Sequence, residues 1–357
     1  MSAPEFTEPM SIKGLSVGVV HWFDEDHAAT QFGQVVDYLG GQSKGFMFNS
    51  KMPDSLDMVI ARGPFGSLVP IANQILALPV PQRPAFILMM SEQLPNPKIP
   101  EWIRYWGGIL RTRIERIAYS KPESDKWQAS PKFKWITSKA HRFRYYGDLW
   151  WLRRQGILSV LSISSKWTGE FLRVRGFDPL VLPIGHLPDK YDNLELERNV
   201  PVLWLGKIGS PRRGRILKDI RKELRTKGVE MLVIDGVENP YVFGDKCSEL
   251  LSRTKIALNL LRSDWDDNSM RYLIAAPRRA LIVGEITLPH TDFMPGVHRI
   301  EAPVGKLAET ILYYLDHEEE RRRIADQAYQ LVTSYSPIDR VLHILETGAA
   351  VKIGGKA

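Results

Sequence analysis

The sequence predicts an α/β protein built from two doubly wound domains, and three observations support this. Short apolar runs recur along the chain, each followed by a turn and an amphipathic stretch. A chain of 357 residues exceeds what one hydrophobic core usually organises. The pattern also restarts after a stretch punctuated by Pro183, Gly185 and Pro188. We therefore expect an N-terminal domain over 1–188, a C-terminal domain over 189–345 and a flexible tail over 346–357.

The N-terminal domain alternates strands and helices as a parallel sheet requires. Its apolar runs are nearly continuous, which is typical of strands buried on both faces. The predicted strands are 15–22, 56–62, 85–90 and 157–164, and the predicted helices are 30–39, 68–78, 101–119 and 166–173.

The C-terminal domain repeats this alternation. Because parallel strands end at one edge of their sheet, the residues that follow them gather on a common rim, where ligands of such sheets bind. The predicted strands are 200–206, 230–236, 255–259 and 280–283, and helices are expected up to Arg225, over 246–253, from Met270, over 304–315 and over 318–332.

Basic and aromatic residues are concentrated between Lys98 and Gly156. This window holds 14 Lys or Arg against 5 Asp or Glu, and six of the ten tryptophans of the chain. Such a mixture suits an anionic membrane surface, a lipid-linked acceptor or a nucleic acid. The alternative is a helical subdomain with buried tryptophans and a solvated basic face. On the helix over 101–119, one face is apolar through Ile103, Trp106, Leu110, Ile114 and Ile117.

Composition excludes several classes of protein. A single cysteine, Cys247, cannot form a disulfide framework, and its expected role is that of a small core residue in a reducing compartment. No apolar run approaches the length of a membrane span and the N-terminus lacks a signal-peptide pattern, so we expect a cytoplasmic protein. No spacing of His, Cys and carboxylates predicts a metal site, and neither a Gly-x-Ser-x-Gly nor a Walker loop is present.

Candidate ligand-binding residues follow the strands of the C-terminal domain. Glycine allows a close backbone approach to a ligand, and arginine can hold a diphosphate through two parallel hydrogen bonds. Carboxylate, amide and hydroxyl groups at strand ends can bind sugar hydroxyls, although Asp235 can equally cap a turn. The candidates are Gly206, Lys207, Arg212, Arg213, Asp235, Asn259, Ser269, Arg271, Arg278, Arg279 and Glu285.

Two residues that follow strands of the N-terminal domain are candidates for acid or base chemistry. Glu92 follows the third predicted strand and is the first choice for a general base or an acceptor-binding carboxylate. His27, in the turn after the first strand, is the second choice. Gly185 and His186 are expected to border the hinge and the cleft between the domains.

The second half of the chain resembles a family of glycosyltransferases. Its motifs are LeuAsn at 258–259, Ser269, Arg271 with Tyr272, PheMetProGly at 293–296, IleLeuTyrTyrLeu at 311–315 and GluGluArgArgArgIleAla at 319–325. Together they resemble the group-1 type of GT-B glycosyltransferase, specifically the spore-maturation CgeB-type family. The first half matches only in outline, through ArgGlyPheAspProLeuValLeuProIleGlyHis before the boundary.

This resemblance implies two Rossmann-like domains facing a cleft, with a nucleotide-sugar held mainly by the second. It implies transfer of the sugar with retained configuration, no metal and no cofactor beyond the nucleotide-sugar co-substrate. The acceptor would approach from the N-terminal domain, where the basic and aromatic residues between Lys98 and Gly156 suggest an anionic, lipid-linked or polymeric acceptor and peripheral membrane contact. Arg271 would then act in catalysis as well as in donor binding.

One position departs from the family pattern. The family places a ribose-binding glutamate three residues after the arginine, but this chain has Ile274. An aliphatic side chain cannot accept a hydrogen bond from a ribose hydroxyl, so Glu285 or another group takes over the contact or the contact is lost. Two alternatives therefore stay open beside the enzyme: a non-catalytic nucleotide- or sugar-binding protein on this fold, and a DNA-binding or DNA-modifying glycosyltransferase.

Overall fold

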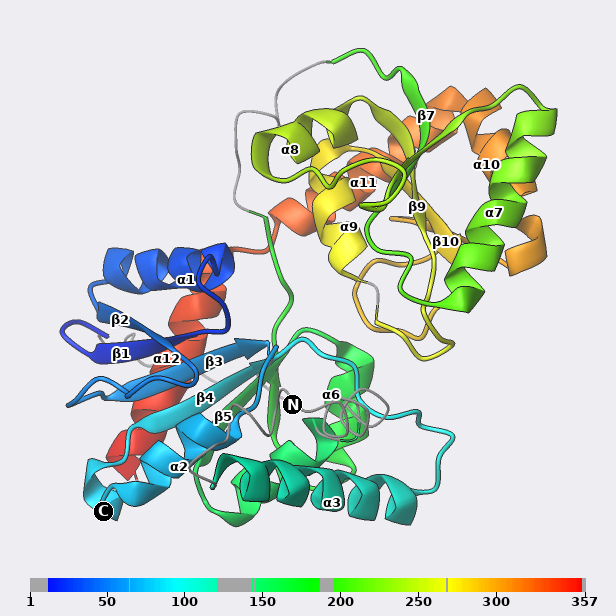
Figure 1. Cartoon of the computed structure of the whole chain (residues 1–357). Helices are drawn as coiled ribbons and strands as arrows, with labels where there is room; N and C mark the ends of the chain where they lie inside the picture. The colour runs from blue at the N-terminus through cyan, green and yellow to red at the C-terminus, as the bar shows by residue number, and fades with distance from the viewer. Residues whose placement is uncertain are drawn as a thin grey trace, which may run out of the picture. The chain divides into compact units, whose positions relative to one another are not determined.

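The computed structural model describes residues 12–63, 65–120, 143, 145–186, 196–267 and 269–354. The chain forms two compact units, each with its own parallel sheet (Figure 1). Unit 1 comprises Met1–Ser164, Thr168–Leu182 and Ile338–Ala357, and unit 2 comprises Ser165–Trp167 and Pro183–Pro337. The predicted class, two doubly wound α/β domains, is confirmed. In the described part of the chain, no helix is both long and apolar enough to cross a bilayer.

The sheet of unit 1 has the order β2-β1-β3-β4-β5-β6, and every pair of neighbours is parallel. Its strands are β1 (Ser16–His21), β2 (Gln42–Met47), β3 (Met58–Gly63), β4 (Ala85–Met90), β5 (Leu158–Ile163) and β6 (Pro179–Val181). Its helices are α1 (His27–Tyr38), α2 (Val69–Ala77), η1 (Val80–Gln82), α3 (Glu101–Tyr119), α6 (Lys166–Arg173) and α12 (Pro337–Gly354).

The last helix of the chain returns to unit 1. Figure 1 shows α12 running along the sheet, and its Ile344 and Leu345 are buried in one cluster with Val36 of α1 and Ile60 of β3. The flexible tail expected over 346–357 is therefore wrong as far as Gly354, where α12 ends. The buried aliphatic residues on one face of α12 explain why this helix is held on the sheet.

The sequence prediction also missed the edge strand β2. Its sequence, QSKGFM, is largely polar and mostly exposed or half-buried, because an edge strand covered on one side does not need apolar side chains on both faces. It pairs with β1 in register from Ser16–Gln42 to His21–Met47. The short strands β6 and β11 were also missed, because three residues are too few to show a periodicity.

The sheet of unit 2 has the order β11-β10-β9-β7-β8, again parallel throughout. Its strands are β7 (Val200–Leu205), β8 (Met231–Ile234), β9 (Thr254–Asn259), β10 (Leu281–Glu285) and β11 (Ile300–Ala302). Its helices are α7 (Pro211–Thr226), α8 (Gly244–Ser252), α9 (Met270–Ala275), η2 (Ala276–Arg278), η3 (Val304–Lys306), α10 (Leu307–Asp316) and α11 (Glu318–Thr333).

Alternating side chains of β7 supply both cores of unit 2. Trp204 packs with Leu217 of α7 and Ile311 of α10 on one face of the sheet. Leu203 packs with Tyr272 of α9 on the other face, together with α8 and α11. Figure 1 shows the same division, with α7 and α10 on one side of the strands and α8, α9 and α11 on the other. The sheet is thus covered on both faces, and only its two ends remain for a ligand.

Helix α3 crosses the helical segment 145–154 at a contact between two glycines. A Cβ on Gly147 would lie 2.0 Å from the carbonyl oxygen of Gly108, and a Cβ on Gly108 would lie 2.8 Å from the Gly147 nitrogen. Only residues without a side chain permit this approach. The middle of the predicted basic and aromatic segment between Lys98 and Gly156, residues 121–142, lies outside the described residues.

We expect Gly147→Ala to lower the free energy of unfolding by about 2 kcal/mol or more, because the new methyl group meets backbone atoms that cannot move aside. Gly305→Ala is the matched control, since a Cβ there meets nothing within 4 Å. Urea unfolding monitored by circular dichroism measures both variants. Equal midpoints for the two would contradict the crossing.

Candidate functional site

The carboxyl end of the unit 2 sheet holds most of the predicted site residues. The chain leaves β7 toward β8 on one side and later returns to β9 on the other, so the strand order switches direction between β7 and β9. Ligands of open parallel sheets bind at such a switch point. The loop after β7, the N-terminus of α7 and the loop after β9 all begin there.

Arg271, in the first turn of α9, extends over this switch point. Its guanidinium carbon lies 4.0 Å from the ring centroid of Trp204. Nε donates to the Leu205 carbonyl at 3.0 Å, and Nη1 lies 3.5 Å from Oδ1 of Asn259 and 3.4 Å from the Leu260 carbonyl. The cation therefore reaches both strands that flank the switch.

The charge of Arg271 is poorly compensated. Burial first, and then the positive charge of Arg213, lower its pKa to about 9, while Asp266 offsets only part of this. Arginine stays protonated at neutral pH, so the lowered pKa reports a cation that an added anion would stabilise. Nη2 lies beside Gly206, where a Cβ would come within 3.0 Å of it. Gly206 has φ +119°, a conformation that favours glycine.

Trp204 is a site residue that the sequence analysis missed. Its indole Nε1 donates to the Gly206 carbonyl at 2.8 Å, and its ring forms the platform under Arg271. A fully buried tryptophan in a strand gives the same sequence signal as any core residue. Only the place of Trp204 next to the end of β7 could have indicated that it belongs to the site.

Arg213 holds the loop after β7 from inside. Its Nη1 donates to the carbonyls of Lys207 and Ile208 at 3.1 and 3.2 Å, and its Nη2 lies 3.5 Å from Asp266. Burial lowers its pKa to about 10, although Asp266 opposes the shift. Arg213 was predicted to bind the donor, but these contacts make it a residue that positions the loop. Lys207 itself is exposed on that loop.

Arg212 and Glu285 form a two-pronged ion pair across the rim. The distance from Nη1 to Oε1 is 3.0 Å and from Nη2 to Oε2 is 2.5 Å. Hydrogen bonding to Glu285 raises the pKa of Arg212. Glu285 Oε1 also accepts the Leu261 N–H at 2.8 Å, so the carboxylate anchors the loop after β9.

Asp235 and Ser269 lie at the rim, but their side chains close local turns. Asp235 Oδ1 accepts the N–H groups of Val237 and Glu238, both at 2.8 Å. Burial alone would raise the pKa of Asp235, but the backbone donors outweigh it and hold the pKa below its ordinary value. Ser269 donates its hydroxyl to Asp267. The turn-capping alternative for Asp235 is therefore the one that the geometry supports.

Arg278 and Arg279 were predicted at the ligand rim, and this placement is wrong. They precede β10, so they lie at the amino end of the sheet, whereas Arg271 lies at the carboxyl end. Arg278 is buried and donates to Ser248 at 3.2 Å. Arg279 pairs with Asp326 at 3.1 Å and stacks on Tyr329 of α11. The sequence ProArgArg occurs twice, at 211–213 and at 277–279. The first triplet follows strand β7, whereas the second precedes strand β10.

Ile274, where the family resemblance places a glutamate, puts an apolar side chain at this position. It lies in α9 and is 38% exposed. Glu285 remains on the same rim, but Arg212 and the Leu261 N–H already occupy its oxygens.

The carboxyl end of the unit 1 sheet holds Glu92 and His27. Glu92 follows β4 and is partly buried, and His27 is exposed at the start of α1. The neighbouring Asp26 caps α1 by accepting the Ala29 N–H at 3.0 Å. Unit 1 thus presents both predicted residues at the carboxyl end of its sheet.

Two arginines at the same end of unit 1 were missed. Arg62 ends β3 and Arg340 lies in the first turn of α12. Burial and the charge of Arg62 lower the pKa of Arg340 to about 10. Burial likewise lowers the pKa of Arg62, although Asp26 opposes it. α12 was not predicted, so its arginine could not be placed in this domain from the sequence.

Gly185 and His186 lie at the start of unit 2, beside the point where the chain leaves it. The chain crosses between the units after Leu182 and again after Pro337. A Cβ on Gly185 would lie 1.9 Å from the Tyr335 carbonyl oxygen, and the His186 N–H donates to Val332 at 3.3 Å. These two segments of unit 2 therefore lie against each other, and the expectation that Gly185 and His186 border a hinge and a cleft stays a prediction.

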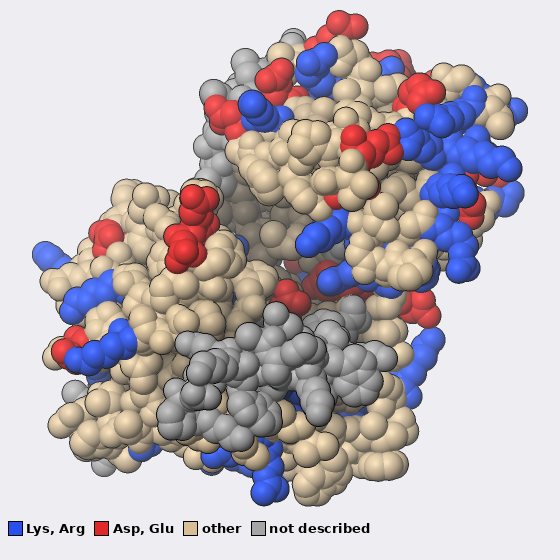
Figure 2. Space-filling view, in the orientation of Figure 1, with Lys and Arg blue, Asp and Glu red and all other residues tan. Residues whose placement is uncertain are grey.

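Exposed basic residues cover α7 next to the rim. Figure 2 shows Lys and Arg gathered over this helix, and its exposed members are Arg215, Lys218, Lys222 and Arg225. By contrast, Arg104 and Arg111 from the predicted basic window are buried. A positive surface beside the switch point attracts an anionic ligand from a distance.

Comparison with known proteins gives a match for the second unit. Residues 212–346 match a family described as glycosyl transferase-like. The search of curated proteins finds no match.

Solved structures are similar to the whole chain at low sequence identity. Anabaena Alr3699/HepE, solved with UDP and glucose, is 10% identical with a TM-score of 0.54, covering 92% of this chain and 97% of that one. The pneumococcal O-GlcNAc transferase GtfA, solved with UDP and GlcNAc, is 9% identical with a TM-score of 0.50, covering 84% and 57%. TarM is 10% identical with a TM-score of 0.49, covering 81% of this chain and 54% of TarM. The chain thus spans little more than half of GtfA and TarM.

The protein has the GT-B glycosyltransferase fold. The two parallel sheets and the likeness to Alr3699/HepE and GtfA establish this. In this GT-B protein, the glycosyl transferase-like match begins at Arg212 and therefore includes Arg271 and Glu285. The CgeB-type assignment stays a prediction.

We expect Glu285→Gln to lower the free energy of unfolding by about 2 to 3 kcal/mol, because the buried Glu285 loses the charge that accepts hydrogen bonds from the partly exposed Arg212 and from the Leu261 N–H. Glu309→Gln is the control, since its pair with Lys306 is solvent-exposed and should contribute little. Urea unfolding gives both values. A loss at Glu285 no larger than at Glu309 would contradict the anchoring role.

Proposed function

We propose that the protein is a glycosyltransferase that moves a sugar from a nucleotide diphosphate donor to an acceptor. The observation that carries the proposal is Arg271, a poorly compensated cation at the switch point of a glycosyl transferase-like unit. A diphosphate is the anion that such a position suits, because its charge grows as the glycosidic bond breaks.

The donor site consists of groups on three segments. The diphosphate lies against Nη2 of Arg271, the exposed Lys207 and the N-terminus of α7, whose 16 residues align their peptide dipoles toward the rim. Gly206 lets the ligand approach the backbone. Alr3699/HepE and GtfA were solved with UDP, so UDP-sugars are the first donors to test.

The proposed reaction retains the anomeric configuration and uses no metal ion. An acceptor hydroxyl oxygen forms the new bond to the anomeric carbon as the bond from that carbon to the phosphate oxygen breaks. The acceptor proton passes to the departing phosphate on the same face. Arg271 and Lys207 stabilise the charge on that phosphate.

Unit 1 is proposed to bind the acceptor at the carboxyl end of its sheet. Glu92 is the candidate base or hydroxyl-binding carboxylate, with His27 as the second candidate. Arg62 and Arg340 add positive charge at this end, which supports an anionic acceptor. A lipid-linked or polymeric acceptor carrying phosphate or carboxylate fits this charge. Nucleic acid is the less favoured partner, since Arg104 and Arg111 are buried.

A non-catalytic binding protein is the second candidate, and Ile274 favours it. Without a carboxylate at that position, the nucleotide loses one expected ribose contact. Such a protein would bind UDP and neither transfer nor hydrolyse the sugar.

We expect Arg271→Ala to raise the Kd for UDP about 10- to 100-fold, because charge-assisted hydrogen bonds are lost. The kcat/KM for transfer should fall about 100- to 1,000-fold. Arg271→Lys should lie between, since it keeps the charge but not the planar fork. Calorimetry with UDP and release of UDP from UDP-glucose and UDP-GlcNAc are the measurements.

The control is Arg225→Ala, which removes an exposed arginine from the far end of α7. It should bind and react as the wild type does. Unchanged UDP binding in Arg271→Ala would refute the site. Tight UDP binding by the wild type, with no release from any UDP-sugar and acceptor tried, would favour the non-catalytic protein.

A further inference from the structure

Helix α3 turns its apolar face to solvent. The exposed fractions are 67% for Trp102, 62% for Trp106, 60% for Leu110, 48% for Ile117 and 37% for Ile103. These residues recur at three- and four-residue steps, so they form one stripe along the helix. A solvated helix normally presents its polar face, and large apolar patches on a surface mark binding sites.

The opposite face of α3 is polar and buried. Arg111 pairs with Glu115 at 2.7 Å, and both side chains are almost fully buried. Glu115 also accepts the Ser67 hydroxyl at 3.1 Å, and Thr112 donates to the buried Asp148 at 2.7 Å. These bonds satisfy polar groups that would otherwise be costly to bury.

The helix cannot rotate to hide the stripe. Gly108 meets Gly147 with their backbones in contact, and a residue with a side chain at this crossing would clash. Rotation would also break the bonds of Arg111 and Thr112 inside the unit. The outward direction of Trp106 and Leu110 is therefore built into the fold.

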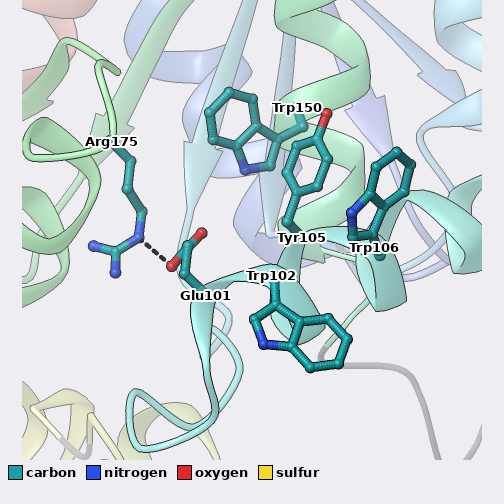
Figure 3. Close-up of a pocket in the computed structure, with 6 residues that line it drawn as sticks. All are labelled: Glu101, Trp102, Tyr105, Trp106, Trp150 and Arg175. Carbon is teal, nitrogen blue, oxygen red and sulfur yellow. Dashed lines mark hydrogen bonds and ion pairs between the residues drawn. The ribbon is translucent and has the colours of Figure 1, made fainter.

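An aromatic hollow opens at the start of the stripe. It measures 590 Å³ and is lined by Glu101, Trp102, Tyr105, Trp106, Trp150 and Arg175 (Figure 3). The Tyr105 ring lies edge-on to Trp106 at 5.2 Å and to Trp150 at 5.3 Å. Figure 3 shows the Tyr105 ring between the indoles of Trp150 and Trp106, with Trp102 below them. Amphipathic rings of this kind concentrate at the boundary between lipid and water.

Arginines flank the stripe. Arg113 is exposed and follows Trp106 by seven residues, so it lies on the same side two turns further along. Arg116 is exposed beside it, and Arg154 stacks on Tyr105 at 5.3 Å. The two acids of α3 are engaged: Glu101 with Arg175, and Glu115 with Arg111. The net charge along this face is positive.

We propose that the outward face of α3 docks on an anionic lipid bilayer, with the helix lying in the plane of the headgroups. Exposed Trp, Leu and Ile supply the apolar contact, and Arg113, Arg116 and Arg154 supply the attraction to anionic lipids. A soluble glycan would use the indoles but has no use for Leu110 and Ile117. The aliphatic part of the stripe is what selects a lipid surface.

This inference deepens the proposed function, on which it rests for a lipid-linked acceptor at unit 1. It is tested without donor or acceptor, so lipid binding and sugar transfer can fail separately. The full chain is sedimented with sucrose-loaded vesicles of phosphatidylcholine, with and without phosphatidylglycerol.

The wild type should sediment with the anionic vesicles and less with the neutral ones, and added salt should release it. The double variant Trp106→Gln/Leu110→Gln should bind about 10- to 100-fold more weakly, because it loses buried apolar area. Arg113→Gln should lose about 5-fold. Its melting temperature and that of the double variant should match the wild type, since these side chains are exposed.

Tyr38→Gln is the matched control, because Tyr38 is an aromatic residue of unit 1 that is 76% exposed on α1. It should bind as the wild type does. The proposal is overturned if the wild type does not sediment at low salt, or if the double variant binds equally well. It is also overturned if sedimentation velocity shows a dimer that the double variant dissociates, because a second copy would then cover the face.

Discussion

The stacking of Arg271 on Trp204 is the interaction on which the proposed site depends. It places a cation over the point where the strand order of unit 2 reverses. Gly206 leaves room for that cation, Arg213 holds the loop that carries Gly206, and the pair of Arg212 with Glu285 holds the loop opposite. Each of these groups is partnered by the protein, whereas Arg271 keeps a charge that burial disfavours. The rim is therefore arranged around one position where an anion is needed.

The sequence sufficed for the parts of the fold that are buried on both faces. Strands such as β4, AFILMM, are recognisable because parallel sheets demand continuous apolar runs. The polar edge strand β2 gave no such signal. The two ProArgArg triplets show a further limit, because the residues are identical while the chain directions differ. Arg212 leaves a strand and reaches the rim, but Arg279 enters a strand and packs on α11.

Periodicity likewise identified α3 but not its orientation. A stripe through Ile103, Trp106 and Leu110 predicts an amphipathic helix, and burial of the stripe is the usual outcome. Here the Gly108–Gly147 crossing and the buried pair of Arg111 with Glu115 fix the other face inward. The pair of Arg111 with Glu115 lies within the helix, but the glycine crossing depends on Gly147 and the hydrogen bond that holds Glu115 inward comes from Ser67. Tertiary contacts therefore decided which face became a surface.

The family resemblance places a ribose-binding glutamate where this chain has Ile274, and the contacts of Glu285 argue against that residue as its replacement. Glu285 is the carboxylate on the same rim, but recruiting it would release Arg212 and the Leu261 N–H. Glu285 accepts three hydrogen bonds from these two groups, and each bond to a charged acceptor contributes about 1.5 to 3 kcal/mol, whereas a ribose offers at most two hydroxyl donors. The exchange is unfavourable, so Glu285 keeps its structural partners. Under the proposed function, the backbone near Gly206 and the exposed Lys207 are then the groups left to bind the nucleotide, which favours contacts to the diphosphate over contacts to the ribose.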